Sequence, residues 1–350
     1  MSLKISYLVL AGLASVLSVA TTAVAQTGAS APAKTAPPLQ LQNLDPTSKP
    51  DPFPPVNPKF FTANTPTVDT VNSFLKALWG YDPNRIWRVE AIQTTQAPGV
   101  SKVVVFVSEK TPNAKVQTTA FFVTPDGKHA IADSSGVVSF GATPFAEVRK
   151  MLQDRADGAT RGATSKDLML VEFADLQCPH CKDAQGTMDQ LVKDFPNARV
   201  VFQSFPLVDI HPFAFKAAAY GYCIEKQKPG AYFPYATAVF ETQGALTAET
   251  GDVTLKNAVT KAGLDPVAVD ACAATPATKE QVEASAKLAT DAGVDQTPML
   301  SVNGHMLPLA GIPYETLKTI IAYQATLDGV GAGGGSAAVP ARTGPPTLGK

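Results

Sequence analysis

The sequence lacks an excess of basic residues and, beyond residue 25, any long apolar run. Lys and Arg number 29 against 30 Asp and Glu, so the formal net charge is -1, and nothing in that balance points to a nucleic-acid partner. A membrane-spanning helix needs about 20 apolar residues, and no later segment reaches that length. No Cys directly follows residue 25 to accept a lipid, so we expect the mature chain to be soluble.

Cysteine and histidine are also scarce, with four of each. A structural zinc site needs a full tetrahedral set of ligands. Cys178, His180 and Cys181 lie in one tight turn, and no second cluster supplies the missing ligand. Haem attachment through C-x-x-C requires a His directly afterwards, where this chain has Lys182. The sequence therefore predicts neither a metal nor a cofactor, and a metal-binding module on this turn is the disfavoured alternative.

Both ends of the chain have the composition of segments outside a folded core. Residues 1–25 combine Lys4, an apolar stretch over 7–19 and small residues at 23–25, which predicts a cleaved secretory signal and a periplasmic location. An uncleaved anchor is disfavoured because that stretch is shorter than about 20 residues. Residues 26–59, rich in Pro and Ala, predict a disordered leader, and residues 328–350 predict a disordered tail.

Residues 60–140 predict a small α+β domain. Apolar residues at helical spacing follow Thr67 and end near Gly80. β-branched and aromatic residues then predict strands over 86–95, 103–108, 116–123 and 129–132, with a turn at 125–128. Its only His is His129, and it has no Cys, so it offers little chemistry of its own. A linker helix is predicted within 141–165, and the glycines over 157–162 indicate a domain boundary.

The stretch 168–182 predicts a strand that delivers a dithiol. Residues 168–173 are apolar except for Glu172, as in a strand buried on both faces. Pro179 suits the first turn of a helix, which places Cys178 at the helix N-terminus. There the unpaired backbone N–H groups and the helix dipole stabilise a thiolate.

The remainder predicts a parallel crossover with a helical insertion. A helix to about residue 194 and a strand over 199–205 complete a strand-helix-strand unit. Helical patterns then fill about 210–292, before a hairpin over 299–307 with its turn at Asn303-Gly304 and a last helix over 313–324.

The cysteines leave the disulfide pattern open, since four allow three pairings. If Cys178 pairs with Cys181, then Cys223 and Cys272 remain for each other, and the chain-entropy model gives that cross-link roughly 4 kcal/mol. Two unrelated buried thiols are the alternative.

Three groups of residues resemble a known family. Glu172 and its neighbours precede Cys-Pro-His-Cys at 178–181, Ser-Phe-Pro-Leu at 204–207 precedes His211-Pro212, and Gly-Val-Asp-Gln-Thr-Pro at 293–298 precedes Val-Asn-Gly at 302–304. Together they resemble the DsbA-like thioredoxin-fold thiol-disulfide oxidoreductases over 166–327. The resemblance implies an α/β chain, with a thioredoxin fold that carries an inserted helical subdomain and follows the small α+β domain.

The resemblance also implies roles for these residues. Cys178 would form a mixed disulfide with a substrate cysteine, and Cys181 would resolve it. Thr297 and Pro298, joined by a cis peptide bond, would face the dithiol and bind substrate as an added strand. Cys223 and Cys272 match positions where a subset of the family carries an extra cysteine pair.

Two side chains near the dithiol have competing interpretations. His180 would stabilise the Cys178 thiolate and make the disulfide more oxidising, and the alternative is a solvent-exposed turn residue. Glu172 matches a family carboxylate and would accept or relay the Cys181 proton, and the alternative is a strand-edge carboxylate facing solvent.

The small domain bears on the direction of the reaction. Residues 121–128 and the order of helix and strands resemble the N-terminal dimerisation domain of DsbC and DsbG isomerases, which implies a homodimer through residues 60–140. The dithiol and the insert are closer to the oxidase. The predicted function is oxidation of cysteine-containing exported proteins, with a membrane partner that recycles the dithiol. A dimeric isomerase or reductase is the alternative, and an inert interaction protein is disfavoured by the intact dithiol and Thr297-Pro298.

Overall fold

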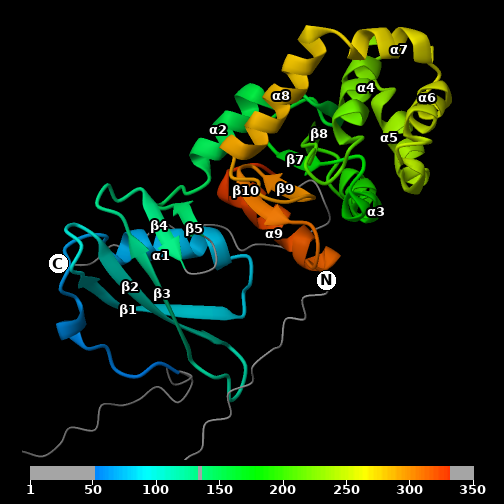
Figure 1. The fold of residues 1–350 in the computed structure, drawn as a ribbon. Helices are drawn as coiled ribbons and strands as arrows, with labels where there is room; N and C mark the ends of the chain where they lie inside the picture. The colour runs from blue at the N-terminus through cyan, green and yellow to red at the C-terminus, as the bar shows by residue number, and fades with distance from the viewer. Residues whose placement is uncertain (1–51, 133–135, 332–350) are drawn as a thin grey trace, which may run out of the picture. The chain divides into compact units, whose positions relative to one another are not determined.

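The computed structural model describes residues 52–132 and 136–331 of the chain. The predicted signal segment, most of the leader and most of the tail lie outside these residues. In the described part of the chain, no helix is both long and apolar enough to cross a bilayer. The strands of this part form two five-stranded sheets, each with its own helices, so the chain is α/β (Figure 1).

A short helix lies where the predicted leader ends. Pro58–Phe60 forms a short 3-10 helix, η1, which begins at Asn57, where the side chain accepts from the Lys59 N–H. The N–H groups of Thr62 and Ala63 then both donate to the Ile92 carbonyl. These backbone bonds attach the segment that directly follows the predicted leader to the first sheet, and that attachment is not visible in its composition.

The first sheet is an antiparallel meander in the order β1-β2-β3-β4-β5. Its strands are β1 (Arg85–Thr94), β2 (Ser101–Glu109), β3 (Gln117–Val123), β4 (His129–Ala132) and β5 (Gly136–Ser139). α1 (Val68–Trp79) begins at Thr67, where the side chain accepts from the Thr70 N–H. Its apolar residues Val71, Phe74 and Leu75 pack in the core of this domain. The helix and the first four strands confirm the prediction, whereas β5 was not predicted.

The second sheet has the order β10-β9-β7-β8-β6, with β7 at its centre. Its strands are β6 (Ala159–Gly162), β7 (Met169–Ala174), β8 (Arg199–Ser204), β9 (Met299–Val302) and β10 (His305–Pro308). β7 runs parallel to β8 and antiparallel to β9. All six residues of β7 are buried, so the prediction of a strand buried on both faces is confirmed.

Helices cover both faces of this sheet. α2 (Ala146–Arg155) and α8 (Pro276–Asp291) pack on one face, where Leu152 and Leu288 meet Val171 and Phe173. α3 (Pro179–Asp194) and α9 (Tyr314–Leu327) pack on the other face, where Leu191 and Ile321 meet Leu170. The α3 bounds agree with the predicted helix at both ends.

The predicted domain boundary over 157–162 is corrected by the structure, because Ala159–Gly162 forms the edge strand β6. It pairs antiparallel with β8, with Ala159 opposite Phe202. A Cβ at Gly158 would collide with the Phe202 carbonyl oxygen, and one at Gly162 with the Ala198 carbonyl oxygen. These glycines allow the edge strand to approach its neighbour closely. In the sequence alone, the same glycines resemble the signals of a loop.

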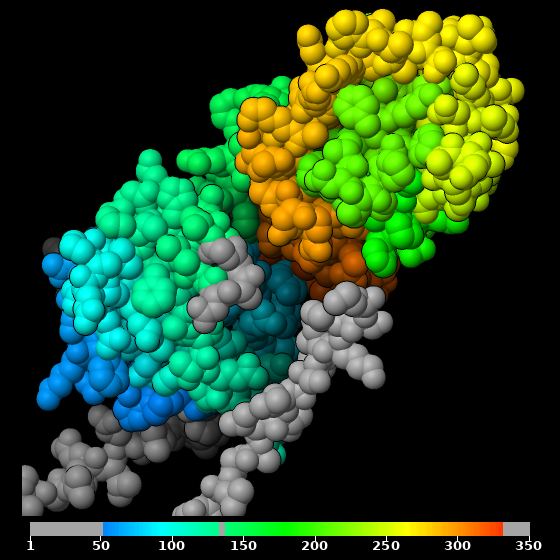
Figure 2. Space-filling model, in the orientation of Figure 1, coloured from blue at the N-terminus to red at the C-terminus, as the bar shows by residue number. Residues whose placement is uncertain are grey.

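Between β8 and β9 lies the predicted helical insert. With α8 it contains α4 (Ala214–Gln227), α5 (Tyr232–Glu241), η2 (Gln243–Ala245), α6 (Gly251–Lys261) and α7 (Pro266–Ala273), and their side chains form the yellow-green and yellow surface of Figure 2. A disulfide joins Cys223 of α4 to Cys272 of α7, with the two Cα atoms 6.0 Å apart. The core of the insert reaches back to the dithiol, since Tyr235 and Cys223 belong to the same buried cluster as Cys181.

Candidate active site

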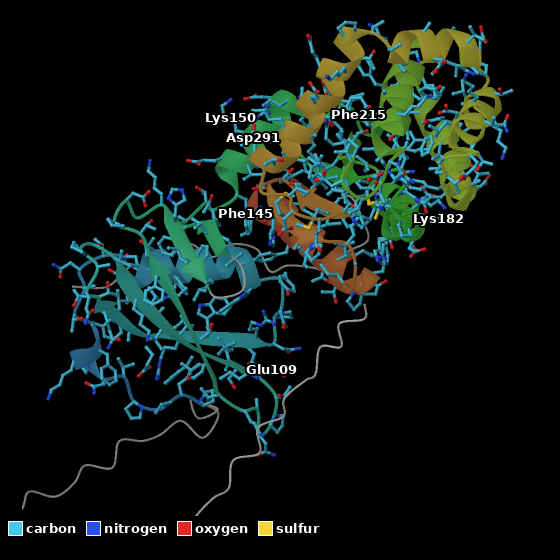
Figure 3. The ribbon with its side chains drawn as sticks, in the orientation of Figure 1. Glu109, Phe145, Lys150, Lys182, Phe215 and Asp291 are labelled. Atoms are coloured by element: carbon cyan, nitrogen blue, oxygen red, sulfur yellow. A yellow bond between two sulfur atoms is a disulfide. The ribbon has the colours of Figure 1, made fainter. Side chains whose placement is uncertain are left out.

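The Cys-Pro-His-Cys turn starts α3. Cys178 is the N-cap residue, with extended backbone angles, and Pro179 opens the helix. The Cys178 carbonyl accepts from the N–H groups of Cys181 and Lys182, at 3.1 and 3.3 Å. Lys182, labelled in Figure 3, marks this start of the helix. Both thiols are free, so this structure contains the reduced dithiol.

The two thiols are in different electrostatic environments. The pKa of Cys178 is lowered to about 5, mainly by a hydrogen bond from the Cys181 thiol. Burial acts against this shift, whereas the Thr297 side chain and the backbone N–H groups of Cys181 and His180 add to it. Burial raises the pKa of Cys181, and the neighbouring Cys178 raises it further. At neutral pH these shifts favour a thiolate at Cys178 and a protonated thiol at Cys181.

The structure brings Thr297 and Pro298 to this turn, 119 residues further along the chain. The peptide bond between them is cis. The Cys178 Sγ lies 3.8 Å from the Thr297 carbonyl oxygen. The Thr297 hydroxyl is buried without a regular hydrogen-bond partner in the described part of the chain, and it lowers the pKa of both thiols. Thr297 thus lies beside Cys178, and Pro298 follows it through the cis bond.

Glu172 is buried beneath α3, with 1% of its surface exposed. Burial raises the pKa of its carboxyl group from 4.5 to about 7. The Gln185 side chain of α3 donates both to Glu172 Oε1, at 2.8 Å, and to the Cys181 carbonyl oxygen, at 2.9 Å. The burial excludes a strand-edge carboxylate that faces solvent, and Gln185 links the carboxyl group to the turn that holds Cys181.

His180 and Pro179 lie on the exposed side of the turn. The contribution of His180 to the low pKa of Cys178 comes from its backbone N–H. The amide of this residue is therefore part of the thiolate site whatever its side chain does.

Three residues beside the dithiol were not predicted from the sequence. The Gln243 side chain donates to the carbonyl oxygens of Leu176 and Cys178, both at 2.9 Å. The Gln177 side chain donates to the Leu246 carbonyl and accepts from the Phe213 N–H. The third residue is Asp175, which is 2% exposed. Only Asp175 left a signal, as an acidic residue in an otherwise apolar stretch, because the partners of the two glutamines are far away in sequence.

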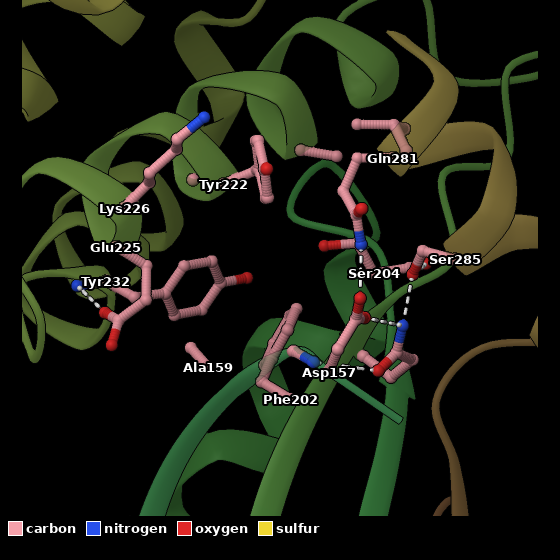
Figure 4. A pocket seen from close by; sticks show the side chains of 15 residues that line it. Asp157, Ala159, Phe202, Ser204, Tyr222, Glu225, Lys226, Tyr232, Gln281 and Ser285 are labelled. Atoms are coloured by element: carbon pink, nitrogen blue, oxygen red, sulfur yellow. Dashed lines mark hydrogen bonds between the residues drawn. The ribbon is translucent and has the colours of Figure 1, made fainter. Parts of the chain in front are cut away.

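A cavity of about 200 Å³ lies elsewhere in this domain, and no predicted site residue lines it (Figure 4). Phe202, Tyr222 and Tyr232 give it a largely apolar lining, with Asp157, Lys226 and Gln281 among its polar residues. Among residues 52–132 and 136–331, no group of three or more His, Cys, Asp or Glu side chains could hold a metal ion. The reactive groups therefore gather at the start of α3.

Residues 155–323 match the family model described as Thioredoxin. This segment, which is just under half of the chain, is similar to the thioredoxin family. The match agrees with the thioredoxin fold that the resemblance predicted for residues 166–327.

Some curated relatives share parts of the chain. Two Na(+)/H(+) antiporters are similar to parts of it. NhaA 1 of Salinispora arenicola is 40% identical over 58 residues, or 17% of this chain and 9% of that protein. NhaA of Herminiimonas arsenicoxydans is 32% identical over 148 residues, or 42% of this chain and 22% of that protein. The chain thus spans less than a quarter of the length of these relatives.

Solved structures resemble about half of the chain. ScsC of Proteus mirabilis has a TM-score of 0.44 at 20% identity, over 52% of this chain and 78% of its own. A thioredoxin-like oxidoreductase of Silicibacter pomeroyi has a TM-score of 0.44 at 21% identity, over 51% and 98%. BdbD of Bacillus subtilis has a TM-score of 0.44 at 19% identity, over 50% and 95%. Likenesses of this degree say nothing about substrates.

Proposed function

We propose that the protein is exported to the periplasm and oxidises cysteine pairs of exported proteins. The observation that supports this direction is the contrast between the thiols, with the pKa of Cys178 at about 5 and that of Cys181 raised by burial. A stabilised Cys178 thiolate favours the reduced enzyme, so the Cys178–Cys181 disulfide readily accepts electrons.

The proposed cycle starts from the oxidised dithiol. A substrate thiolate attacks Cys178 Sγ, the Cys178–Cys181 bond breaks, and Cys181 leaves as a thiolate that takes up a proton. A second substrate thiolate then attacks the substrate sulfur of the mixed disulfide, which releases Cys178 as its stabilised thiolate. The substrate has lost two electrons, which the dithiol passes to a membrane partner. We assign Thr297 and Pro298 to substrate binding, because they lie against Cys178 Sγ.

A redox titration of the dithiol, on protein whose mass in solution is known, tests this proposal. An oxidase should have a potential above about -180 mV and should oxidise a reduced peptide that contains two cysteines. A potential near that of thioredoxin, at about -270 mV, would contradict the oxidising direction. Metal analysis of the same sample tests the metal-binding alternative.

One observation favours a dimeric isomerase as the second candidate. Phe122, Ile131 and Val137 lie opposite one another across β3, β4 and β5, and each is exposed. An exposed apolar row on a sheet is typical of an interaction face, and a second copy of the chain would cover it. A dimer by light scattering that refolds scrambled ribonuclease would favour this candidate, whereas a monomer without refolding activity would exclude it.

We assign Glu172 to proton transfer with Cys181, and Glu172→Gln is expected to slow exchange through Cys181. The same variant should change how stability depends on pH. The folded-state pKa of Glu172 is raised from 4.5 to about 7. The contribution of this carboxyl group to wild-type stability is therefore fully present below pH 4.5 and is lost as the pH rises through 7. The variant lacks this loss, so its unfolding free energy should exceed that of wild type by about 3 kcal/mol at pH 8 and converge with it at pH 4.

Urea unfolding at both pH values measures this difference. Glu147→Gln is the matched control, because it removes an exposed carboxylate from the first turn of α2. A difference of the same size at pH 4 and pH 8, together with unchanged exchange through Cys181, would remove Glu172 from the mechanism.

A further inference from the structure

Asp175 lies at the end of the strand that carries the dithiol, and its side chain has no exposed surface. Its Oδ1 atom accepts from the Gln177 N–H at 2.7 Å. Its Oδ2 atom accepts from the Leu207 N–H at 2.9 Å and from His211 Nδ1 at 2.8 Å. A buried carboxyl group is costly unless its oxygens are bonded, and here both oxygens are. The side chain thus ties the segment before Cys178 to the loop between β8 and α4.

The backbone of Asp175 faces the second thiol. Its N–H lies 3.4 Å from Cys181 Sγ and is directed at it. Cys181 is fully buried, so water cannot solvate a negative charge on its sulfur. This N–H opposes the rise in the Cys181 pKa that burial causes. The backbone groups that lower the pKa of Cys178 belong instead to His180 and Cys181.

We propose that Asp175 is a positioning residue for Cys181: its carboxyl group, held by Gln177, Leu207 and His211, fixes the turn so that its own N–H stabilises the Cys181 thiolate. This inference rests on the proposed thiol-disulfide exchange. In that exchange, Asp175 controls the reactivity of Cys181, the second thiol of the pair. His211 adds a side-chain donor that keeps 17% of its surface exposed.

The N–H acts wherever charge develops on Cys181. When a substrate thiolate opens the internal disulfide, the S–S electron pair moves to Cys181 Sγ, which the N–H stabilises as the leaving group. In the reverse step, Cys181 loses its proton and attacks Cys178 Sγ of a mixed disulfide, and the bond between Cys178 and the outgoing thiolate breaks. Loss of the N–H contact slows both steps. When the reduced enzyme attacks an external disulfide, the attack by Cys178 that forms the mixed disulfide does not depend on this contact.

The aromatic disulfide dithiobis-nitrobenzoate separates the two thiols in one experiment. Mixed in excess of the reduced full chain, it gives a coloured thiolate when Cys178 attacks. It gives a second when Cys181 resolves the resulting mixed disulfide. Asp175→Asn keeps the size of the side chain but replaces one acceptor oxygen with an NH₂ donor. We expect the second phase to slow about tenfold, as for loss of one hydrogen bond to a charged group, and the first phase to change less than about twofold.

Two further variants complete the test. His211→Asn leaves both backbone donors to Asp175 in place, so the second phase should slow by about threefold, in line with a weaker loss. Asp183→Asn, at an exposed position of α3, controls for removal of negative charge and should leave both phases unchanged. Equal slowing of both phases in Asp175→Asn, or slowing of neither, would overturn the proposal. So would unfolding of both the Asp175 and the His211 variants, because the group would then be a folding determinant. A wild-type chain without a second phase would instead contradict the proposed function.

Discussion

A Cys178→Ala variant is expected to lose at least about a thousandfold in the rate of disulfide exchange, because no other group in the turn can act as the attacking thiolate. Cys181 cannot take its place, since it is fully buried and its pKa is raised. Cys181→Ala is the matched control. It keeps the nucleophile but lacks the resolving thiol, so Cys178 should attack a peptide disulfide, release one half as a thiolate and stay joined to the other half as a mixed disulfide. Mass spectrometry of the unreduced protein detects that adduct.

The pH dependence of alkylation provides the second part of this test. The rate of reaction of the reduced Cys181→Ala variant with iodoacetamide follows the Cys178 thiolate. Loss of the Cys181 hydrogen bond, the largest cause of the low pKa, should move its midpoint above the value of about 5 expected for wild type. An ordinary thiol titrates near about 8.5. A wild-type midpoint at that ordinary value, or undiminished exchange by Cys178→Ala, would contradict the assignment of Cys178.

The low pKa also links the dithiol to stability. A group whose pKa is lower in the folded than in the unfolded chain stabilises the folded state at high pH. For the reduced protein this contribution is complete above the ordinary thiol pKa and is lost as the pH falls through about 5. The oxidised protein has no such titration. The stability of the reduced protein relative to the oxidised protein should therefore fall on acidification. This is the thermodynamic counterpart of an oxidising disulfide.

The sequence predicted the parts of the site that depend on local chemistry. The helix start at Cys178 follows from Pro179 and the preceding apolar strand, and α3 ends at Asp194 as expected. Even the burial of Glu172 was implied, because a strand buried on both faces leaves no exposed position for its charge. The solvent-facing alternative for Glu172 was therefore at odds with the prediction for its own strand.

The parts that were missed depend on contacts between distant segments. β6 is short, and the glycines directly before it and at its last position allow a close approach to Phe202 and Ala198 that only the assembled sheet defines. The donation from Gln243 to the Cys178 carbonyl spans 65 residues, and a lone glutamine in a short 3-10 helix carries no signal of such a role. Asp175 lies within the most informative stretch, yet its partner His211 is 36 residues away. Patterning locates elements, but it does not show which polar side chain finds which backbone group.

Removal of the disulfide in the insert is expected to produce the largest loss of stability. The Cys223–Cys272 bond spans 49 residues, a segment that contains α5 and α6. In the chain-entropy model, a loop of that length constrains the unfolded chain by about 4 kcal/mol. Whole domains have only about 5 to 15 kcal/mol of stability. The double variant Cys223→Ala, Cys272→Ala should therefore unfold at a much lower urea concentration under oxidising conditions.

The control for this variant must separate the structural bond from the dithiol, because a reductant opens both. In a Cys178→Ala background the active site cannot form its own disulfide, so the effect of reductant on urea unfolding there reports the Cys223–Cys272 bond alone. The loss caused by reduction in that background should equal the loss caused by the double variant within about 1 kcal/mol, the difference being the two deleted sulfur atoms. The double variant should still react with dithiobis-nitrobenzoate in two phases, since the groups that lower the pKa of Cys178 belong to Cys181, Thr297 and His180. A stability loss below about 1 kcal/mol in both measurements would mean that helix packing, rather than the cross-link, holds α4 against α7.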